Sequence, residues 1–143
     1  MSKLIICTDG ASKGNPGPAG IGVVISTDDG SILREIAEHI GNQTNNVAEY
    51  VALIKGLNCA RELGGTELDI YVDSELMAKQ LSGDYKVRSQ NLQQLHGEAL
   101  RLIHSFPRVR VFHVRREHNA RADKLASQAA AKAVTPTPKR DTS

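Results

Sequence analysis

Four acidic residues that lie far apart along the chain occupy positions where a carboxylate can do chemistry. Two short apolar runs each lead into an aspartate, residues 5–8 into Asp9 and residues 70–72 into Asp73. Open sheets bind ligands beyond the carboxyl ends of their parallel strands, which is where such aspartates would stand. Each aspartate by itself could equally end its strand or cap the helix that follows, so the pair needs support from other residues.

Glu49 and Asp123 supply that support. Glu49 lies near the start of a predicted helix, beside Tyr50 and four residues before Leu53, on the side that faces the sheet. An unpaired buried charge is costly, and no lysine or arginine lies nearby in the sequence, so a bound metal cation is indicated. Asp123 opens the last predicted helix, where a favourable interaction with the helix dipole is the alternative explanation.

The four acids together predict a metal centre. If the strands before Asp9 and Asp73 are adjacent and parallel, the two aspartates lie side by side, and Glu49 and Asp123 reach in from two helices. Four carboxylates repel one another unless divalent cations neutralise them, and oxygen ligands favour Mg²⁺ or Mn²⁺ over zinc. Two such ions can align the attacking water and the leaving oxygen of a phosphodiester. The pattern therefore predicts phosphodiester hydrolysis without a protein nucleophile.

The elements that must position these acids follow from hydrophobic periodicity and turn residues. Strands are expected at residues 4–8, 21–26, 32–40, 67–72 and 109–114, and the arginines that alternate along the last of these suit a sheet edge. Helices are expected at residues 46–63, 74–81, 91–104 and 120–133. Glycine and proline predict turns at residues 14–20 and 29–30. The order βββαβααβα predicts an α/β fold with one mixed five-stranded sheet flanked by helices. One domain is expected over residues 1–133, followed by a disordered tail at residues 134–143.

Composition limits the class of protein. The 143 residues are 40% hydrophobic and 24% charged, as in ordinary globular proteins. No apolar run approaches the roughly 20 residues that cross a bilayer, and the first residues lack the apolar length of a signal peptide. A cytoplasmic monomer without a membrane partner is therefore expected. Cys7 and Cys59 are interpreted as buried thiols, and the net charge of +2 permits a nucleic-acid partner without requiring one.

Five segments of the chain, taken in order, resemble type 1 ribonuclease H. They are Thr8-Asp9-Gly10-Ala11-Ser12, Gly14-Asn15-Pro16-Gly17-Pro18, Thr44-Asn45-Asn46-Val47-Ala48-Glu49, Val72-Asp73-Ser74 and His118-Asn119-Ala120-Arg121-Ala122-Asp123. The resemblance covers roughly residues 3–133 and implies the ribonuclease H-like fold. It also implies that Asp9, Glu49, Asp73 and Asp123 form the metal-binding catalytic set. The implied reaction is hydrolysis of the RNA strand of an RNA/DNA hybrid, leaving 3′-hydroxyl and 5′-phosphate ends.

The same resemblance implies a set of substrate contacts. The loop at Gly14 and Asn15 would lie along the RNA strand, and Thr44 would lie near a DNA phosphate. The implied substrate-binding set is completed by Gly10, Ser12, Asn45, Asn46 and Ser74. Small polar side chains and glycine amides can approach a backbone and its 2′-hydroxyls closely. His118 is the candidate for proton transfer or product release, and a surface histidine without a role is the alternative.

The chain departs from many relatives in one respect. Their basic, tryptophan-containing protrusion is replaced here by the short connection at residues 82–89, and the chain has no tryptophan. An N-terminal hybrid-binding domain is also expected to be absent. Two expectations follow: binding of the hybrid is weaker than in those relatives, or it depends on Lys86, Arg88 and the arginines around Arg115.

Three alternatives are weaker. A catalytically silent module that grips hybrid or double-stranded RNA should have lost an acid, and none is lost. A different two-metal nuclease of this fold, such as a resolvase or an integrase-like core, would not be expected to share the segments at residues 14–17 and 44–46. A polymerase-attached domain is disfavoured because the chain begins and ends close to the predicted fold. The sequence therefore favours the ribonuclease.

Overall fold

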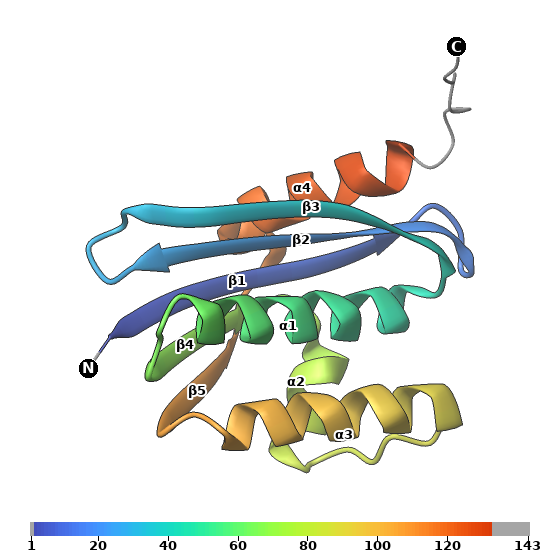
Figure 1. Ribbon diagram of the computed structural model, residues 1–143. Coiled ribbons are helices and arrows are strands. Elements are labelled where there is room, and N and C mark those ends of the chain that lie inside the picture. Colours follow the sequence, from blue (N-terminus) through green and yellow to red (C-terminus); the bar gives the residue numbers. More distant parts are fainter. Residues whose placement is uncertain (1, 133–143) are drawn as a thin grey trace.

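The computed structural model describes residues 2–132 as a five-stranded sheet with helices on both faces (Figure 1). The strands are β1 (Lys3–Ser12), β2 (Gly17–Thr27), β3 (Ile32–Gln43), β4 (Glu67–Val72) and β5 (Arg108–His113). The helices are α1 (Asn45–Glu62), α2 (Glu75–Ser82), α3 (Gln90–His104) and α4 (Ala120–Lys132), with a single 3₁₀ turn, η1 (Arg116–Asn119), before α4. The order of strands and α-helices is the one that the sequence predicts. The tail predicted at residues 134–143 lies outside the described residues.

The sheet has the strand order β3-β2-β1-β4-β5 and changes character at its centre. Strands β1, β2 and β3 form an antiparallel meander, whereas β4 runs parallel to β1 and β5 parallel to β4. Cys7 of β1 pairs with Tyr71 of β4. Asp9 and Asp73 each lie two residues after this pair. The parallel pairing therefore brings the two aspartates to the same end of the sheet, as predicted. Strand β5 lies at the sheet edge, which agrees with its arginine-alternating sequence.

The first three strands are longer than the sequence predicts. The predicted turn at residues 14–20 is shorter, because β2 already begins at Gly17 and Ser12 pairs with Ala19. The turn still needs glycine at Gly14, where φ is +138°. Asp9 consequently lies inside β1, opposite Gly22, and does not end the strand as its sequence context suggests. Pairing between the long strands overrides the local turn preference of glycine and proline.

The main core lies between the sheet and the helices α1 and α3. The predicted stripe of α1 is buried as expected, and its largest members are Tyr50, Leu53 and Leu57. These side chains pack on sheet residues such as Ile6 and Ile70, which are also fully buried. No helix among residues 2–132 combines the length and apolar character needed to cross a membrane.

Helix α4 covers the opposite face of the sheet with small residues. Its buried side consists of the predicted alanines and leucine, Ala122, Leu125, Ala126, Ala129 and Ala130. The helix backbone approaches β2 so closely that a Cβ on Gly22 would lie 2.1 Å from the carbonyl oxygen of Ala122. A Cβ on Gly20 would lie 2.4 Å from the amide nitrogen of Ala130. Glycine is therefore required at both positions by close approach.

We expect Gly22→Ala to lower the free energy of unfolding by roughly 3 kcal/mol, because α4 must move away from β2 to admit the methyl group. Gly97→Ala is the matched control, since a Cβ at this exposed position of α3 meets no atom within 4 Å. That substitution should raise the free energy of unfolding by about 0.5–1 kcal/mol, because alanine is the better helix former. Urea unfolding followed by circular dichroism measures both, and equal stability of the two variants would contradict the close packing.

Candidate active site

Three of the predicted acids form a tight group at one end of the sheet. Asp9, Glu49 and Asp73 each offer a carboxylate oxygen, and these three oxygens lie within 4.8 Å of one another. Asp9 is only 1% exposed and Glu49 8% exposed. Glu49 reaches the group because the first turn of α1 packs directly on Gly10, where a Cβ would lie 2.4 Å from the amide nitrogen of Glu49.

Asp123 joins the group from the opposite face of the sheet. It lies in the first turn of α4 and lines the same cavity of about 350 Å³ as Glu49. Burial and the charge of Glu49 raise the pKa of Asp9 most, and the nearby carboxylate of Asp123 raises it further. The structure therefore brings all four predicted acids together, with Asp123 beside the three-oxygen group and outside it.

The electrostatics of the group favour a bound cation. Burial raises the pKa of Asp9 most strongly, and the negative charge of Glu49 adds to this effect. Burial also raises the pKa of Glu49, followed by the charge of Asp73. Oxygen Oδ1 of Asp9 and Oε1 of Glu49 are buried and accept no hydrogen bond from the described residues. Buried, unpaired carboxylate oxygens at this spacing suit a divalent cation with oxygen ligands.

Two residues to which the sequence assigned no role at the acids contact them. The side-chain nitrogen of Asn119, which is 2% exposed, lies 2.9 Å from the carbonyl oxygen of Thr8 and 3.4 Å from Oδ2 of Asp73, and donates to both. Nη1 of Arg116 lies 3.8 Å from Oδ1 of Asp123, and Arg116 lines the cavity. Burial raises the pKa of Glu49, and the positive charge of Arg116 offsets a small part of that rise. A cation thus reaches Glu49 from a distant segment, which no pattern around Glu49 could indicate. Asn119 lies within a segment that carries the family resemblance, and this resemblance is the only sequence feature that could have indicated its contact with the acids.

The predicted substrate loop is held by its own side chains. The amide of Ser12 donates to Oδ1 of Asn45 at 2.9 Å, and the amide of Asn45 donates to Oδ1 of Asn15 at 3.1 Å. The hydroxyl of Ser12 donates to the carbonyl oxygen of Gln43 at 2.8 Å. Both asparagine oxygens are therefore occupied, and their amide nitrogens donate to no residue that the structure describes. These nitrogens are the groups left to meet a ligand.

Thr44, Asn46 and Ser74 differ in their position relative to the cavities. Thr44 caps α1 by accepting from the amide of Val47, and it lines a neighbouring cavity of about 280 Å³ together with Asn46. Asn46 also lines the cavity of the acids. Ser74 caps α2 by accepting from the amide of Met77, so Asp73 is free of the capping role that its sequence position allowed. Ser74 lines neither cavity.

His118 is not brought to the acids. Its residue is exposed in η1, its amide donates to the carbonyl oxygen of Arg115, and it is absent from the lining of the acidic cavity. The described geometry therefore fits the alternative of a surface histidine at least as well as a role in proton transfer.

The chain is similar to several known proteins. A model of the reverse transcriptase-like family matches residues 7–129. The chain is 46% identical over 128 residues to the bifunctional protein Rv2228c of Mycobacterium tuberculosis (strain ATCC 25618 / H37Rv), covering 89% of this chain and 35% of that protein. It therefore spans about a third of the length of this relative. It is 34% identical over 143 residues to ribonuclease H of Prosthecochloris aestuarii (strain DSM 271 / SK 413), covering 89% of this chain and 94% of the relative.

The fold has a close match among solved structures. The crystal structure of LC11-RNase H1 in complex with RNA/DNA hybrid has a TM-score of 0.87 and 42% sequence identity, and the match covers 92% of this chain and 99% of that chain. The mixed five-stranded sheet and four helices are thus those of a ribonuclease H domain. With a family model over most of its length and a similar relative covered almost completely, the chain belongs to the ribonuclease H family.

Proposed function

We propose that this chain is an endoribonuclease that hydrolyses the RNA strand of RNA/DNA hybrids. The products are 3′-hydroxyl and 5′-phosphate ends, and the cofactor is a pair of Mg²⁺ ions for which Mn²⁺ can substitute. The observation that carries the proposal is the carboxylate group of Asp9, Glu49 and Asp73, each of which places one oxygen within 4.8 Å of the others. Oδ1 of Asp9 and Oε1 of Glu49 are also buried without a hydrogen-bond partner among the described residues. Membership of the ribonuclease H family and the hybrid bound to LC11-RNase H1 support the substrate class.

The acids bind the metal ions, and Asn119 orients one of these acids. Asp9, Glu49, Asp73 and Asp123 hold the cations, which supply neutralisation of charge and Lewis-acid polarisation of a phosphoryl oxygen. Asn119 orients the Asp73 carboxylate through its amide, and this fixes one ligand before the cation arrives.

Recognition of the RNA strand depends on groups beside the acids. The free amide nitrogens of Asn15 and Asn45 are donors for ribose 2′-hydroxyls or for base edges in the minor groove, while the occupied oxygens keep the two side chains in place. Gly14 is exposed and gives a backbone surface that a sugar can approach closely, whereas Gly10 packs on α1 and borders the cavity of the acids. Lys13 lines the same cavity and is suited to a phosphate contact.

The remaining parts of the proposal concern the protein as a whole. We infer one ribonuclease H domain over residues 1–133 that acts as a cytoplasmic monomer. Two free cysteines, Cys7 and Cys59, suit a reducing compartment. Light scattering of the purified chain tests the oligomeric state, and a stable dimer would overturn the monomer.

The first test is cleavage of a labelled RNA/DNA hybrid with and without Mg²⁺, beside matching double-stranded RNA and double-stranded DNA. The expected result is metal-dependent cutting of the hybrid's RNA strand alone, since both the acids and the 2′-hydroxyl contacts are then required. Binding of hybrid without cutting would overturn the enzyme and favour a binding module. Cutting of DNA would instead indicate another two-metal nuclease.

We expect Asp9→Asn to lower kcat by more than about 100-fold. Changing a residue that only orients a metal ligand already lowers activity by up to about 100-fold, and removing the ligand itself should lower it further. The same variant should raise the stability of the metal-free protein by roughly 1–3 kcal/mol, since one of the repelling buried carboxylates is gone. Asp28→Asn is the control, because Asp28 is 70% exposed at the side chain and pairs only with Lys3 among the described residues. Retained turnover, or unfolding of the Asp9 variant, would contradict the assignment.

Stability of the metal-free protein should fall as the pH rises. Burial raises the pKa of Asp9 and Glu49 above ordinary values of about 4, so the folded chain keeps protons that the unfolded chain releases. This contribution is complete below about pH 4 and is lost as the pH rises through the raised pKa values. We expect the Tm in EDTA to fall between about pH 5 and about pH 8, and excess MgCl₂ to raise the Tm most at the alkaline end. An increase in Tm by MgCl₂ that is the same at every pH would refute the coupling between metal binding and deprotonation of these carboxyl groups.

A further inference from the structure

The outer edge of β5 offers unpaired backbone groups. Strand β5 is the last strand of the sheet, and among the described residues it pairs only with β4. The amide of Val114 donates to the carbonyl oxygen of Val72 on β4 at 2.9 Å. Because the peptide groups of successive residues point to opposite sides of a strand, the amides of Val109, Val111 and His113 point away from β4. These three amides donate to no residue that the structure describes, so the edge can accept a further strand.

An apolar cavity borders this edge. It has a volume of about 300 Å³ and lies between β5 and the helices α2 and α3. We call it the edge cavity. Its lining side chains are mainly apolar and half-buried: Ala78 and Leu81 of α2, Leu100 and Ile103 of α3, and Val109 and Val111 of β5. A concave apolar surface of this kind suits an apolar side chain of a ligand.

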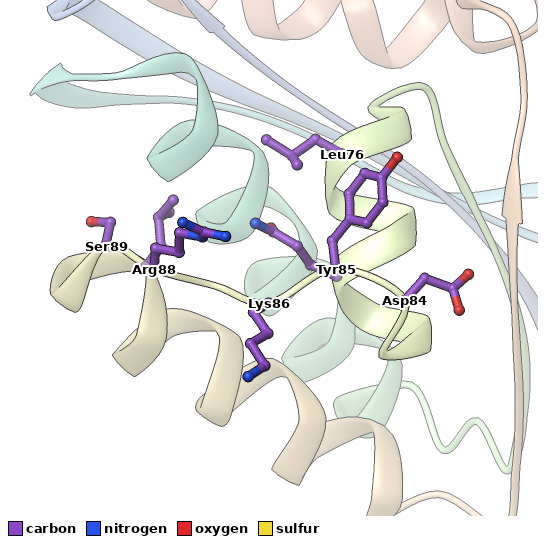
Figure 2. Close-up of a pocket in the computed structure, with 8 residues that line it drawn as sticks. Leu76, Asp84, Tyr85, Lys86, Arg88 and Ser89 are labelled. Carbon is purple, nitrogen blue, oxygen red and sulfur yellow. The ribbon is translucent and has the colours of Figure 1, made fainter.

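The edge cavity is separate from the larger cavity that Figure 2 shows. The larger cavity has a volume of about 570 Å³, and its lining includes Leu76 of α2 together with Lys86 and Arg88, which the sequence associates with the hybrid. Ala78 and Leu81 line the edge cavity from the other side of the same helix. The two cavities share no lining residue, so the edge cavity is not part of the surface associated with the hybrid.

Arginines occupy the opposite face of the same strand. Arg108 and Arg110 alternate with the valines, so their side chains lie on the face away from the edge cavity. The side chain of Arg108 is 65% exposed, and its Nε lies 4.0 Å from Oε2 of Glu67, which is beyond hydrogen-bond distance. Arg110 pairs with Asp69 and is still half exposed. Acidic side chains on a strand laid beside β5 could form cross-strand ion pairs with these arginines.

We propose that β5 and the edge cavity bind an extended segment of a partner protein in which apolar and acidic side chains alternate. The segment adds a strand outside β5 and pairs its main chain with Val109, Val111 and His113. Its apolar side chains enter the edge cavity, and its acidic side chains meet Arg108 and Arg110 on the other face. Main-chain pairing supplies affinity, and the two sets of side chains select the sequence of the partner.

The chemistry of the site favours a peptide over a nucleic acid. No lysine or arginine is among the described residues that line the edge cavity, so the cavity itself offers no cation to a phosphate. A sugar-phosphate backbone also lacks the regular amides and carbonyl groups that pair with a strand edge. The edge cavity shares no lining residue with the cavity of the acids, so the proposal is independent of the hydrolysis proposed above.

The first experiment measures amide hydrogen exchange by NMR in the full chain. The probe is a capped peptide of alternating glutamate and leucine, with the six residues that match β5 in length. In the free protein, Val109 and Val111 should exchange faster than Arg110, whose amide points to β4. At a peptide concentration of ten times Kd, exchange of the two valine amides should slow by about tenfold, since only the free protein exchanges them. Unchanged exchange of both amides at the highest soluble peptide concentration would overturn the proposal.

Changes to the peptide test the strand geometry without altering the protein. The amides of the leucines and those of the glutamates point to opposite sides of the added strand, so only one of the two sets faces β5. N-methylation of that set should abolish binding, whereas N-methylation of the other set should leave it unchanged. A peptide with lysine in place of glutamate should bind more weakly, because it is repelled by Arg108 and Arg110. Binding that tolerates methylation of both sets, or that is stronger for the lysine peptide, would refute strand addition.

Protein variants locate the site. Arg108→Gln should weaken binding of the glutamate peptide by about 2- to 5-fold, the effect of one exposed ion pair. Leu100→Gln places an amide at the edge cavity and should weaken binding several-fold. Leu33→Gln is the control, because Leu33 is 46% exposed on β3 at the other edge of the sheet, and it should leave Kd unchanged. The Tm of each variant shows that it is folded, and equal Kd values in all variants would overturn the placement at β5.

The same exchange measurement distinguishes other occupants of the edge. A short RNA/DNA hybrid, added in EDTA so that it is not cut, should leave the exchange of Val109 and Val111 unchanged. Slowing by the hybrid and not by the peptide would assign the edge to a nucleic acid. Slowing when the chain alone is concentrated would assign the edge to a second copy of the chain. Either result would overturn the proposed peptide.

Discussion

Close contact between helix backbones and sheet backbones sets the positions of Glu49 and Asp123 relative to the sheet. Gly10 admits the first turn of α1, and Gly20 and Gly22 admit α4 from the other face, at distances where a Cβ would overlap backbone atoms. Helices that rest on larger side chains stand farther from a sheet, and carboxylates near their N-termini would then lie too far from a strand to share a cation. The glycines remove that spacing. Glu49 and Asp123 therefore reach Asp9 from opposite faces although neither belongs to the sheet.

That proximity has a cost in the folded state, and the surrounding core has to offset it. Asp9 and Glu49 are buried beside other carboxylates and hold oxygens without partners, so the group opposes folding until a cation or a proton neutralises it. Leu53, Leu57 and Ile70 are fully buried in the hydrophobic layer under α1. The burial of this layer stabilises the fold and offsets the unfavourable free energy of the buried carboxylates. The carboxylates that would bind the metal thus lower the stability of the metal-free fold around Asp9 of β1.

Patterns of local origin were readable from the sequence, and contacts between distant segments were not. Period-two and helical spacing identified the elements. The parallel pairing of β1 with β4 was a condition of the sequence argument, and the structure meets that condition. The length of β2 was not readable, because Pro18 looks like a turn residue until its partner strands are known. Arg116 was missed for the same reason, since its neighbour Asp123 lies on another element and Glu49 is far away in sequence. Ser74 and His118 were assigned by resemblance, and the geometry brings neither into the acidic cavity.

The outer strand β5 has a consequence for behaviour at high concentration. Its arginines alternate along the strand, and Arg110 binds Asp69 of β4 through two hydrogen bonds of 2.9 and 3.0 Å while keeping its side chain 47% exposed. A second molecule that tried to extend the sheet at this border would bring its own arginines against these, so edge-to-edge association is repelled. The ion pairs that fasten β5 to its own sheet therefore also discourage aggregation.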